Sequence, residues 1–223
     1  MRDISVIIPT LNEESFIGAL LSLLRKCPEV HEIIVCDGGS RDGTKDEVMR
    51  YDDVVWVNAS KGRASQMNAG ADVASGNILL FLHADSICNS EGIGRIKTTL
   101  SDELSAGSFY LNFDVQGFWY NLYSAISKCS WTIFTYGDQG LFIRKSFFDR
   151  IGGFRNIPIM EDIDMIRRIK QKGVFKKIDF PITTRARRFK KHGVVLQQLK
   201  NTILVLLYYF GVSPKWLSRF YRY

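Results

Sequence analysis

The stretch ISVIIPTLNEESFIGALLSLL, residues 4–24, changes from a strand pattern to a helix pattern within a few positions. Residues 4–8 are almost all apolar, which is typical of a short strand covered on both faces. From residue 16 to residue 24, apolar side chains recur at helical spacing and line one face. Between them, Thr10 and Glu13 have the offset of a capping box, so we expect the helix to begin there. This stretch therefore predicts a strand followed directly by a helix.

The same alternation continues through the first half of the chain. Apolar runs at 32–36, 54–57 and 77–82 predict three more strands that are buried on both faces. Before the last of them, apolar and small residues at helical spacing predict a helix over 64–74 that stops at Gly76. Strands that alternate with helices are typical of parallel sheets. The sequence therefore predicts an α/β fold with a Rossmann-like, mostly parallel central sheet flanked by helices.

The second half of the chain is less regular. AGSFYLNF (106–113) and QGLFIRKS (139–146) predict two more strands, and the aromatic segment 118–134 has a helix-like pattern. Helices are expected at 161–172 and 193–210. No repeat, low-complexity tract or Pro/Gly-rich linker divides the chain. At 223 residues, we expect it to fold as a single domain.

The composition is that of an ordinary globular protein. With 46% hydrophobic and 24% charged residues, it argues against disorder and against a protein with many membrane spans. The net charge of +7 is unevenly distributed, because residues 164–223 hold 15 of the 30 Lys and Arg but only 2 of the 23 Asp and Glu. A basic tail indicates an anionic partner, such as substrate phosphates, a membrane surface or nucleic acid. The alternative is a merely solvated helical face.

Three features bear on where the protein works. Its four cysteines have no metal-type spacing, and we expect them to be reduced core residues of a cytoplasmic protein. The amino-terminal apolar run is too short for a signal peptide. The apolar run at 203–212 is shorter than the ~20 residues of a spanning helix, but flanking Lys and Arg would let it lie flat on the inner face of the membrane. A helix packed on the protein body is the alternative.

Polar clusters follow the first, second and fourth predicted strands, as PTLNE, DGGSRDG and HADS. In open parallel sheets, ligands bind at the carboxyl ends of the strands, so these clusters mark the expected site. Asp37 precedes Gly38 and Gly39, which would allow a sharp turn and the close approach of a ligand. Alternatively, Asp37 only bonds its own turn. The chain lacks G-x-G-x-x-G after the first strand and lacks a Walker A loop, which argues against a dehydrogenase or an ATPase.

A single carboxylate, Asp85, ends the fourth predicted strand. The next helix is expected to begin near Ser90, so Asp85 is too early to cap it. One aspartate cannot hold a metal alone, but Mg²⁺ or Mn²⁺ needs only one or two protein carboxylates when substrate phosphates fill the other positions. Asp85 therefore suits a metal bound to a diphosphate, with Lys61 and Arg63 sharing the charge of the leaving phosphate.

The motifs SVIIPTLNEE, IIVCDGGSRDGT, KGRASQMNAGADVASG, LLFLHAD, GGF and MEDIDM together resemble family 2 glycosyltransferases, over roughly residues 3–170. GRASQMNAGA, FLHADS and RRFKKHG are also similar to a small bacterial subgroup associated with radical-SAM and selenium-related genes. The resemblance implies a GT-A fold, a nucleotide-diphosphate sugar donor (a UDP- or GDP-sugar), a divalent metal (Mn²⁺ or Mg²⁺) and inversion at the anomeric carbon. It divides the single domain, residues 1–223, into a nucleotide-sugar half at 1–115, an acceptor half at 116–192 and a basic, apolar helical tail at 193–223.

The resemblance also assigns roles to single residues. Pro9 and Glu13 would border the nucleotide, and Asp37 would contact its base. Arg63 would lie near the nucleotide or the diphosphate. Asp85 would hold the metal as the last acid of the family's D-x-D motif.

Position 83 departs from that motif, because His83 stands where the first aspartate is expected. His83 would contact the ribose or the metal, or it would only pack at the end of the strand. The base of the donor therefore stays open.

The segment MEDIDM, residues 160–165, offers a base for the transfer. An inverting reaction needs one base, opposite the leaving group, to take the proton of the acceptor hydroxyl. Glu161, Asp162 and Asp164 are candidates, although acids in a first helical turn also complement the helix dipole. The resemblance favours Asp162 as the base, with Glu161 as its orienting neighbour or as a ligand of the acceptor. GGF, residues 152–154, would be a turn that places an aromatic ring near the acceptor.

Other candidates lie outside these motifs. Asp138 and Gln139, between glycines, would contact either sugar or would only form a turn. Arg187 and Arg188 belong to a basic stretch that would close over the diphosphate. His192 would complete the metal's shell, as a late histidine does in some GT-A enzymes, or would only be solvated.

Two other functions are the alternatives. A nucleotidyltransferase that makes sugar nucleotides would need a glycine-rich basic loop after the first strand, where this chain has PTLNEES. A binding or scaffold protein that uses the basic tail on a membrane surface would not need to retain Asp85, Glu161 and Asp162. Nucleic acid is not expected as a partner, because no RNA-binding signature accompanies the aromatics. The acceptor is unidentified, and the aromatic segment 118–134 with the cationic tail permits a lipid-linked one.

Overall fold

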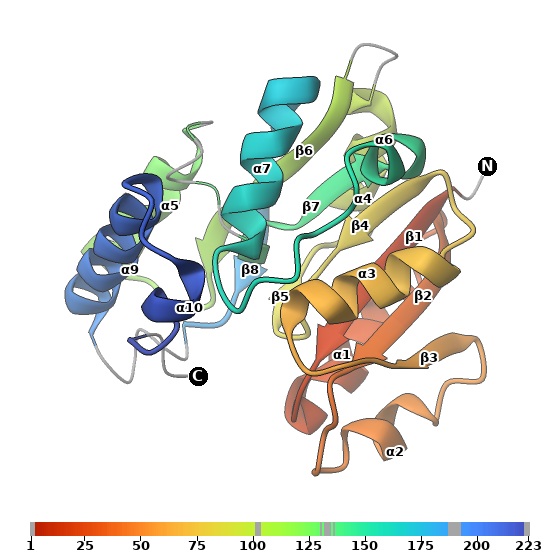
Figure 1. Ribbon diagram of the computed structural model, residues 1–223. Coiled ribbons are helices and arrows are strands. Elements are labelled where there is room, and N and C mark those ends of the chain that lie inside the picture. The colour runs from red at the N-terminus through yellow and green to blue at the C-terminus, as the bar shows by residue number, and fades with distance from the viewer. Residues whose placement is uncertain are drawn as a thin grey trace.

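The computed structural model describes residues 3–100, 104–129, 131, 135, 137–186 and 193–220. Within them, eight strands form one sheet in the order β3-β2-β1-β4-β7-β6-β8-β5, with helices on both faces (Figure 1). The strands are β1 Ile4–Thr10, β2 Val30–Asp37, β3 Val54–Asn58, β4 Ile78–Phe81, β5 Ser86–Ile87, β6 Leu104–Phe113, β7 Leu141–Arg144 and β8 Val174–Thr184. The helices are α1 Glu14–Leu24, α2 Thr44–Val48, α3 Arg63–Val73, α4 Ser90–Thr99, α5 Phe118–Ser127, the 3-10 helix Gly137–Gln139, α6 Lys145–Arg150, α7 Glu161–Lys172, α9 Val194–Tyr209 and α10 Pro214–Leu217.

The first half of the sheet is parallel, as the alternation of strands and helices predicts. β1 pairs in parallel with β2 and with β4, and β2 pairs in parallel with β3. Beyond β4 the sheet is mixed, because β7 runs antiparallel to β4 and to β6, while β6 runs parallel to β8. The predicted α/β class is therefore confirmed, with the parallel strands concentrated in the amino-terminal half.

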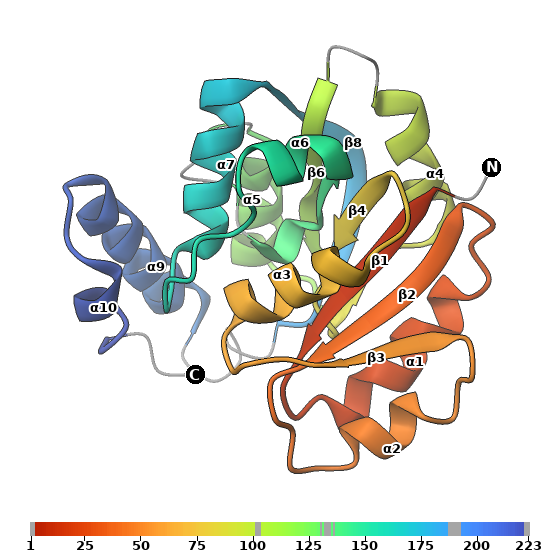
Figure 2. The same ribbon diagram turned by 45° about the vertical axis from the view of Figure 1, so that its right-hand side comes forward.

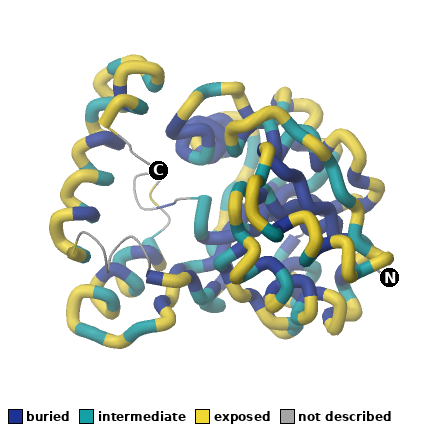
Figure 3. Tube along the Cα trace, turned by 90° about the horizontal axis from the view of Figure 1, so that it is seen from below, coloured by how far each residue is buried: buried dark blue, intermediate teal, exposed yellow. Residues whose placement is uncertain are grey.

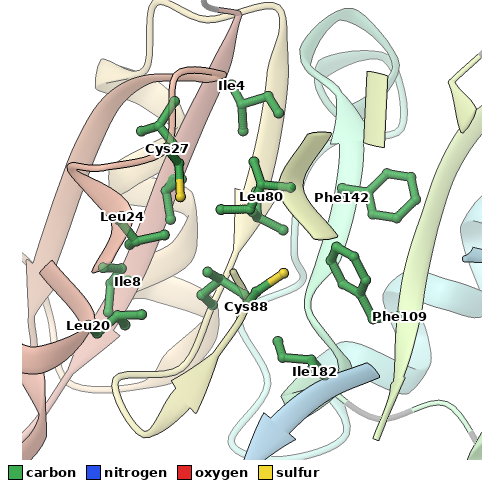
Figure 4. Packing of buried hydrophobic residues seen from close by; sticks show 14 of the residues in the cluster. Ile4, Ile8, Leu20, Leu24, Cys27, Leu80, Cys88, Phe109, Phe142 and Ile182 are labelled. Atoms are coloured by element: carbon green, nitrogen blue, oxygen red, sulfur yellow. The ribbon is translucent and has the colours of Figure 1, made fainter. Parts of the chain in front are cut away.

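The two main apolar clusters begin at β1, because successive residues of a strand point to opposite faces of the sheet. Ile4, Val6 and Ile8 pack with α1 and α4 on one face (Figure 4). Ile7 packs with α3, α6 and α7 on the other face, which is turned toward the viewer in Figure 2. The first predicted strand is thus covered on both sides. β3 differs from that expectation, because it is the edge strand and Val55 is 40% exposed.

The predicted capping box at the start of α1 is wrong. Thr10 is the last residue of β1 rather than a helix cap, and α1 begins only at Glu14. The amide groups at this end of α1 instead bind side chains at the start of α2 and just before it. The N–H of Glu13 donates to Oγ1 of Thr44 at 2.8 Å, and the N–H of Glu14 donates to Oδ2 of Asp42 at 3.2 Å. Tertiary contacts therefore supply the cap that the local sequence pattern was expected to supply.

The helix α3 lies very close to the sheet at Gly70. A Cβ at this position would lie 2.5 Å from Cγ2 of Ile7 and 2.7 Å from Sγ of Cys36, so a side chain does not fit without movement. The predicted helix over 64–74 is confirmed, but Gly76 is not its stop, because Ala74 is already extended. Glycine is used here for close packing.

The second half confirms some predicted elements and corrects others. α7 has the predicted bounds, and β6 and α9 match the predicted strand and helix within two residues. α5 ends at Ser127, well short of residue 134, and β7 is only the middle of the predicted 139–146. The strand β8, in which exposed residues such as Val174, Lys176 and Asp179 are interspersed with half-buried and buried ones, was not predicted.

A third apolar cluster joins the C-terminal helices to the start of α7. Its buried members are Ile159, Met160, Ile163, Leu204, Val205 and Leu217. Met160, the residue before α7, has φ 69° in the left-handed region, which non-glycine residues rarely adopt. No helix of the described residues has both the length and the apolar character to span a membrane. All four cysteines are free, as predicted, and three of them are buried.

Candidate active site

The carboxyl ends of β1, β2 and β4 lie side by side, as the sequence predicts. Thr10 is opposite Asp37 in the register of β1 and β2, and the N–H of Gly38 donates to the carbonyl oxygen of Thr10 at 2.9 Å. On the other side of β1, the N–H of Leu82 donates to the carbonyl oxygen of Ile7 at 3.0 Å. The three polar clusters therefore share one edge of the sheet.

Asp37 is buried at this edge and makes the turn that follows β2. Its Oδ2 accepts the N–H groups of Gly39 and Ser40, each at 2.8 Å, and its Oδ1 accepts the hydroxyl of Ser40. These contacts show that Asp37 bonds its own turn, which is the alternative role predicted from the sequence. A contact between Asp37 and a nucleotide base stays a prediction.

Two loops at this edge are held together by polar contacts. Asn12, with φ 56°, receives the N–H of Arg41 on its Oδ1 at 2.8 Å, and its own N–H donates to Oγ of Ser40 at 2.8 Å. Pro9 and Glu13, on either side of Asn12, are half-buried. The predicted nucleotide-binding residues of β1 and β2 therefore form one connected surface.

Gln66 of α3 binds the backbone at the ends of β1 and β2, and the sequence did not predict this role. The side chain is buried, and its Nε2 donates to the carbonyl oxygen of Thr10 at 2.6 Å and to that of Cys36 at 2.8 Å. The only available signal was a polar residue on the apolar face of a predicted helix. Gln66 fixes the spacing between the ends of β1 and β2.

Four of the predicted site residues line one pocket beside this edge: Arg63, His83, Glu161 and Asp162. They come from the first turn of α3, from the segment after β4, and from the first turn of α7. The remaining walls are Met67, Phe81, Ser108, Thr135, Gly137, Leu141, Phe154 and Ile166. The pocket thus brings together residues that lie far apart in the sequence.

Arg63 and Glu161 form an ion pair inside this pocket. Nε of Arg63 lies 2.6 Å from Oε1 of Glu161, which is only 2% exposed. The other oxygen, Oε2 of Glu161, has no hydrogen-bond partner among the described residues. Burial raises the pKa of the Glu161 carboxyl, the Arg63 guanidinium lowers it in part, and the neighbouring Asp162 raises it. The pocket therefore holds one oxygen of a buried acid that is available to a ligand.

Asp162 also lines this pocket and is half-buried. Its Oδ2 accepts the N–H of Gly137 at 2.6 Å, and its Oδ1 accepts the N–H of Ile163 at 2.8 Å. A Cβ on Gly137 would lie 3.2 Å from Oδ2 of Asp162 and 3.5 Å from Nε2 of His83. The backbone of Gly137 therefore sits between the two side chains and orients the carboxylate of Asp162.

Asp164, the third acid of the motif, has a different role. It is buried, and its Oδ2 pairs with Nε of Arg168 at 2.7 Å, while its Oδ1 pairs with Nη1 of Arg155 at 3.1 Å. Arg168 also donates to the carbonyl oxygens of Ile151 and Gly153, at 2.9 and 2.7 Å. Asp164 therefore holds α7 against the preceding loop.

The segment GGF forms the predicted turn. Gly152 and Gly153 have φ of 79° and 59°, which favour glycine. Phe154 is buried and meets Phe81 edge to face at a centroid distance of 5.0 Å, so its ring is part of the core as well as of the pocket wall. Asn68 of α3 fixes this residue, because its side chain exchanges two hydrogen bonds with the backbone of Phe154, at 2.8 and 2.9 Å.

The segment after β4 carries two side chains that could bind a metal, His83 and Asp85. His83 and Asp85 are half-buried in a turn closed by the N–H of Ser86, and α4 is capped by Asn89, so Asp85 is not a cap. Among the described residues, no three His, Cys, Asp or Glu side chains gather as a complete metal site. One carboxylate and one imidazole fit a Mn²⁺ or Mg²⁺ ion that is held mainly by the oxygens of a diphosphate.

Other predicted residues lie outside the pocket lining. Lys61 is exposed just before α3. Asp138 is half-buried and Gln139 is buried, both on the 3-10 helix that begins with Gly137. The remaining three predictions fall outside the described residues: Arg187, Arg188 and His192.

The chain is similar in sequence to known glycosyltransferases. The family profile described as "Glycosyl transferase family 2" matches residues 5–158. A "PGL/p-HBAD biosynthesis glycosyltransferase" of Mycobacterium bovis is 32% identical over 106 residues, which are 44% of this chain and 41% of that protein. The "UDP-Glc:alpha-D-GlcNAc-diphosphoundecaprenol beta-1,3-glucosyltransferase WfgD" of Escherichia coli is 33% identical over 89 residues, 38% of this chain and 35% of that protein. The matched regions thus span about two fifths or less of these relatives.

The fold is also similar to solved structures. The mannosyltransferase PcManGT from Pyrobaculum calidifontis, solved in complex with GDP-Man and Mn²⁺, matches with a TM-score of 0.71 and 18% sequence identity. The match covers 92% of this chain and 64% of that chain. It shows the GT-A fold that the sequence motifs imply.

Proposed function

The chain belongs to glycosyl transferase family 2, and from this premise we propose that it moves a sugar from a nucleoside-diphosphate donor to a hydroxyl group of an acceptor. The observation that carries the proposal is the pocket in which Arg63, Glu161 and Asp162 converge beside the carboxyl ends of β1, β2 and β4. A cation for phosphate, a buried acid and an oriented carboxylate are the groups that a sugar transfer needs.

Asp162 is the proposed base. The N–H of Gly137 fixes its carboxylate, which would take the proton of the acceptor hydroxyl as that oxygen attacks the anomeric carbon. The bond from that carbon to the diphosphate oxygen breaks on the opposite side, so the configuration inverts. Glu161, with one oxygen paired with Arg63 and the other without a hydrogen-bond partner among the described residues, would hold the acceptor or orient Asp162.

The donor would lie along the edge formed by β1, β2 and β4. Pro9, Glu13 and Asp37 would border the nucleotide, and Lys61 and Arg63 would face its phosphates. The proposal includes both uracil and guanine as the nucleobase of the donor.

Four other polar residues also take part in the proposal. Asp138 and Gln139 would contact one of the sugars, and Arg187 and Arg188 would contact the diphosphate.

Asp85 would hold the divalent metal, Mn²⁺ or Mg²⁺, with His83 or His192 as a further ligand. When bound, such an ion would neutralise the charge that develops on the leaving diphosphate. The support comes from the chemistry of this turn, where one carboxylate and one imidazole end a buried strand. The solved mannosyltransferase with the similar fold binds Mn²⁺ with GDP-Man.

The acceptor proposed is lipid-linked, and the place of action is the inner face of the membrane. The Escherichia coli relative is named for a diphosphoundecaprenol-linked acceptor, and the basic tail of this chain suits an anionic surface. Membrane contact would be peripheral.

A screen of nucleotide sugars tests the proposed function. Thermal unfolding would be followed with each UDP- and GDP-sugar, with Mn²⁺ or with a chelator, because a ligand that binds only the folded state raises its stability. The true donor should raise the midpoint only with metal, and slow release of free nucleoside diphosphate should follow. Release of pyrophosphate from a nucleoside triphosphate would instead show a nucleotidyltransferase. If no donor raises the unfolding midpoint and none releases nucleoside diphosphate, the proposal is refuted and the chain is a binding protein.

A further inference from the structure

The outer side of α9 carries a stripe of exposed apolar side chains. Its members follow each other at steps of three or four residues, so they share one side of the helix. They are Leu196, Leu199, Ile203, Leu206 and Phe210, and the two ends of the stripe are 65% and 85% exposed. Helices at a protein surface normally place polar residues on this side. The stripe therefore needs a covering partner.

The opposite side of α9 is already occupied. Leu204 and Val205 are buried in the cluster with Met160 at the start of α7, and the hydroxyl of Tyr208 donates to Oδ1 of Asp164 at 3.4 Å. At 100° per residue, these positions point away from the stripe. The exposed stripe is thus not the packing face of the helix.

Two helices that contact α9 also expose apolar side chains. α5 contacts α9 and exposes Phe118, Trp119 and Leu122, with Phe118 73% exposed. α10, which also contacts α9, exposes Trp216, whose ring packs against the ring of Phe220 at a centroid distance of 4.5 Å and a tilt of 50°. These helices lie together at the left in Figures 1 and 3, where exposed and half-buried segments predominate in the tube. We call the exposed apolar residues of α5, α9 and α10, with Phe210 and Phe220, the outer face.

The charge of the C-terminal part of the sequence indicates which kind of partner would suit the outer face. Residues 185–223 contain nine Lys and Arg but no Asp or Glu. Lys200, Lys215 and Arg219 are exposed within or beside the outer face. A second copy of the chain would bring the same positive charge and be repelled. Exposed aliphatic and aromatic side chains flanked by lysines and arginines suit the interface of a membrane with anionic lipids.

We propose that the outer face docks on an anionic bilayer. The apolar stripe would enter the boundary between headgroups and acyl chains, and the flanking cations would contact lipid phosphates. The docking itself does not need the sugar transfer, whereas its link to a lipid-linked acceptor rests on the proposed function.

The position of α9 connects this surface to the pocket. α9 packs on the first turn of α7, which carries Glu161 and Asp162, so one helix lies between the bilayer and the site. A helix with its side chains is about 10 Å across. The head of a membrane-bound acceptor could therefore reach Asp162 while its apolar tail stays in the lipid.

Vesicle flotation tests the proposal. The whole chain would be mixed with vesicles of phosphatidylcholine alone, or of equal parts phosphatidylcholine and phosphatidylglycerol, at low and high salt. The test variant carries Leu199→Ser and Ile203→Ser on the outer face. A matched control carries Met49→Ser and Val73→Ser, which replace side chains of similar exposure elsewhere. Thermal unfolding would check that both variants fold.

The expected result is flotation of the wild type and the control with the anionic vesicles, weaker at high salt because ions screen the attraction. Binding of the test variant should fall about tenfold or more, because two large apolar side chains no longer enter the bilayer. Equal flotation of both variants would overturn the proposal. The proposal would also be overturned if the wild type floated with neither kind of vesicle.

Two parallel measurements separate the possible failures. Light scattering would measure whether the wild type and the test variant are dimers. If the wild type is a dimer, the test variant is not, and the wild type does not float, the outer face binds a second copy of the chain and the docking proposal is overturned. Release of nucleoside diphosphate from the donor would be measured without vesicles. If release occurs and flotation does not, only the docking fails. If flotation occurs and release does not, the proposed sugar transfer fails and the docking stands.

Discussion

Nε of Arg63 and Oε1 of Glu161 lie 2.6 Å apart and join the first turn of α3 to the first turn of α7. The first of these helices carries Arg63, which is proposed to face the donor phosphates, and the second carries the proposed catalytic base. Because Glu161 is buried, the pair is shielded from water on the side of the acid. The ion pair therefore ties the two sides of the pocket to each other.

Arg63→Met should lower the free energy of unfolding strongly, by about 3 kcal/mol or more, because it leaves a buried carboxylate without its cation. Arg50→Met is the matched control, since Arg50 pairs with Glu47 at 2.5 Å but is 70% exposed. The control should lose about 1 kcal/mol or less. Urea unfolding of the three proteins would measure both values. Equal losses in the two variants would contradict the account of this pocket.

Asp162→Asn should lower the rate of transfer by roughly 10²- to 10⁴-fold while the protein stays folded and binds its donor, because an amide cannot accept the proton. Asp164→Asn should instead reduce stability, since it removes the partner of the buried Arg168. Initial rates and thermal unfolding of both variants would separate the two roles. Unchanged transfer by Asp162→Asn would remove it as the base.

Asp85→Ala should abolish the effect of Mn²⁺ on nucleoside-diphosphate binding, because it removes the proposed metal ligand and the described residues hold no cluster of three His, Cys, Asp or Glu that could bind the ion instead. Calorimetric titration with UDP and GDP, in Mn²⁺ and in a chelator, would measure it. Asp72→Ala, an exposed acid on α3, is the control and should behave as wild type. If the affinity of the wild type for UDP and GDP is the same in Mn²⁺ and in the chelator, Asp85 holds no metal.

Gly70→Ala should destabilise the protein by about 1 to 3 kcal/mol, although alanine is the better helix former, because its Cβ would overlap Ile7 and Cys36. Gly94→Ala in α4 is the control. There a Cβ would lie 3.3 Å from a carboxylate oxygen of Glu29, which can move. This variant should be neutral or gain up to about 1 kcal/mol. If chemical denaturation ranks the two variants the other way, the close packing at Gly70 is not limiting.

Lys177→Met should change how stability depends on pH. Burial, and then the charge of Lys170, lowers the pKa of Lys177 to about 8, while in the unfolded chain it is about 10.4. Between these values the unfolded state binds the extra proton, so the contribution of Lys177 to stability rises with pH. Below pH 8, the variant is therefore favoured relative to wild type, and this advantage should shrink between about pH 8 and 10.4. A constant difference across this range of pH would show that the ammonium group is not desolvated.

The fold was predictable where the sequence pattern is local. The apolar runs that became β1, β2 and β4 are short and bounded by turn residues, and α7 has acids at its start and lysines near its end. β8 was missed because its lysines break the apolar pattern. It becomes a strand only because β6 lies beside it and supplies the hydrogen bonds.

The site was predictable only in part, for a related reason. Arg63, His83, Glu161 and Asp162 were found through motifs, and the fold brings them into one pocket. Gln66 and Asn68 were not found, because both bind backbone atoms that come near only after folding. For Asp37, the contacts within its own turn could be expected from the neighbouring residues alone. Its predicted contact with a nucleotide involves a ligand and therefore stays a prediction.

The pairing of β4 with β7 has a consequence for attempts to divide this protein. β4 is the strand at which the parallel half of the sheet meets the remainder, from Ile78 opposite Arg144 to Phe81 opposite Leu141. A fragment that stopped near residue 115 would lose β7 and expose β4 as a bare apolar edge, which invites pairing with other chains. Swapping acceptor halves between relatives by a cut at this place should therefore yield aggregates, and chimeras would need to keep both strands from one parent.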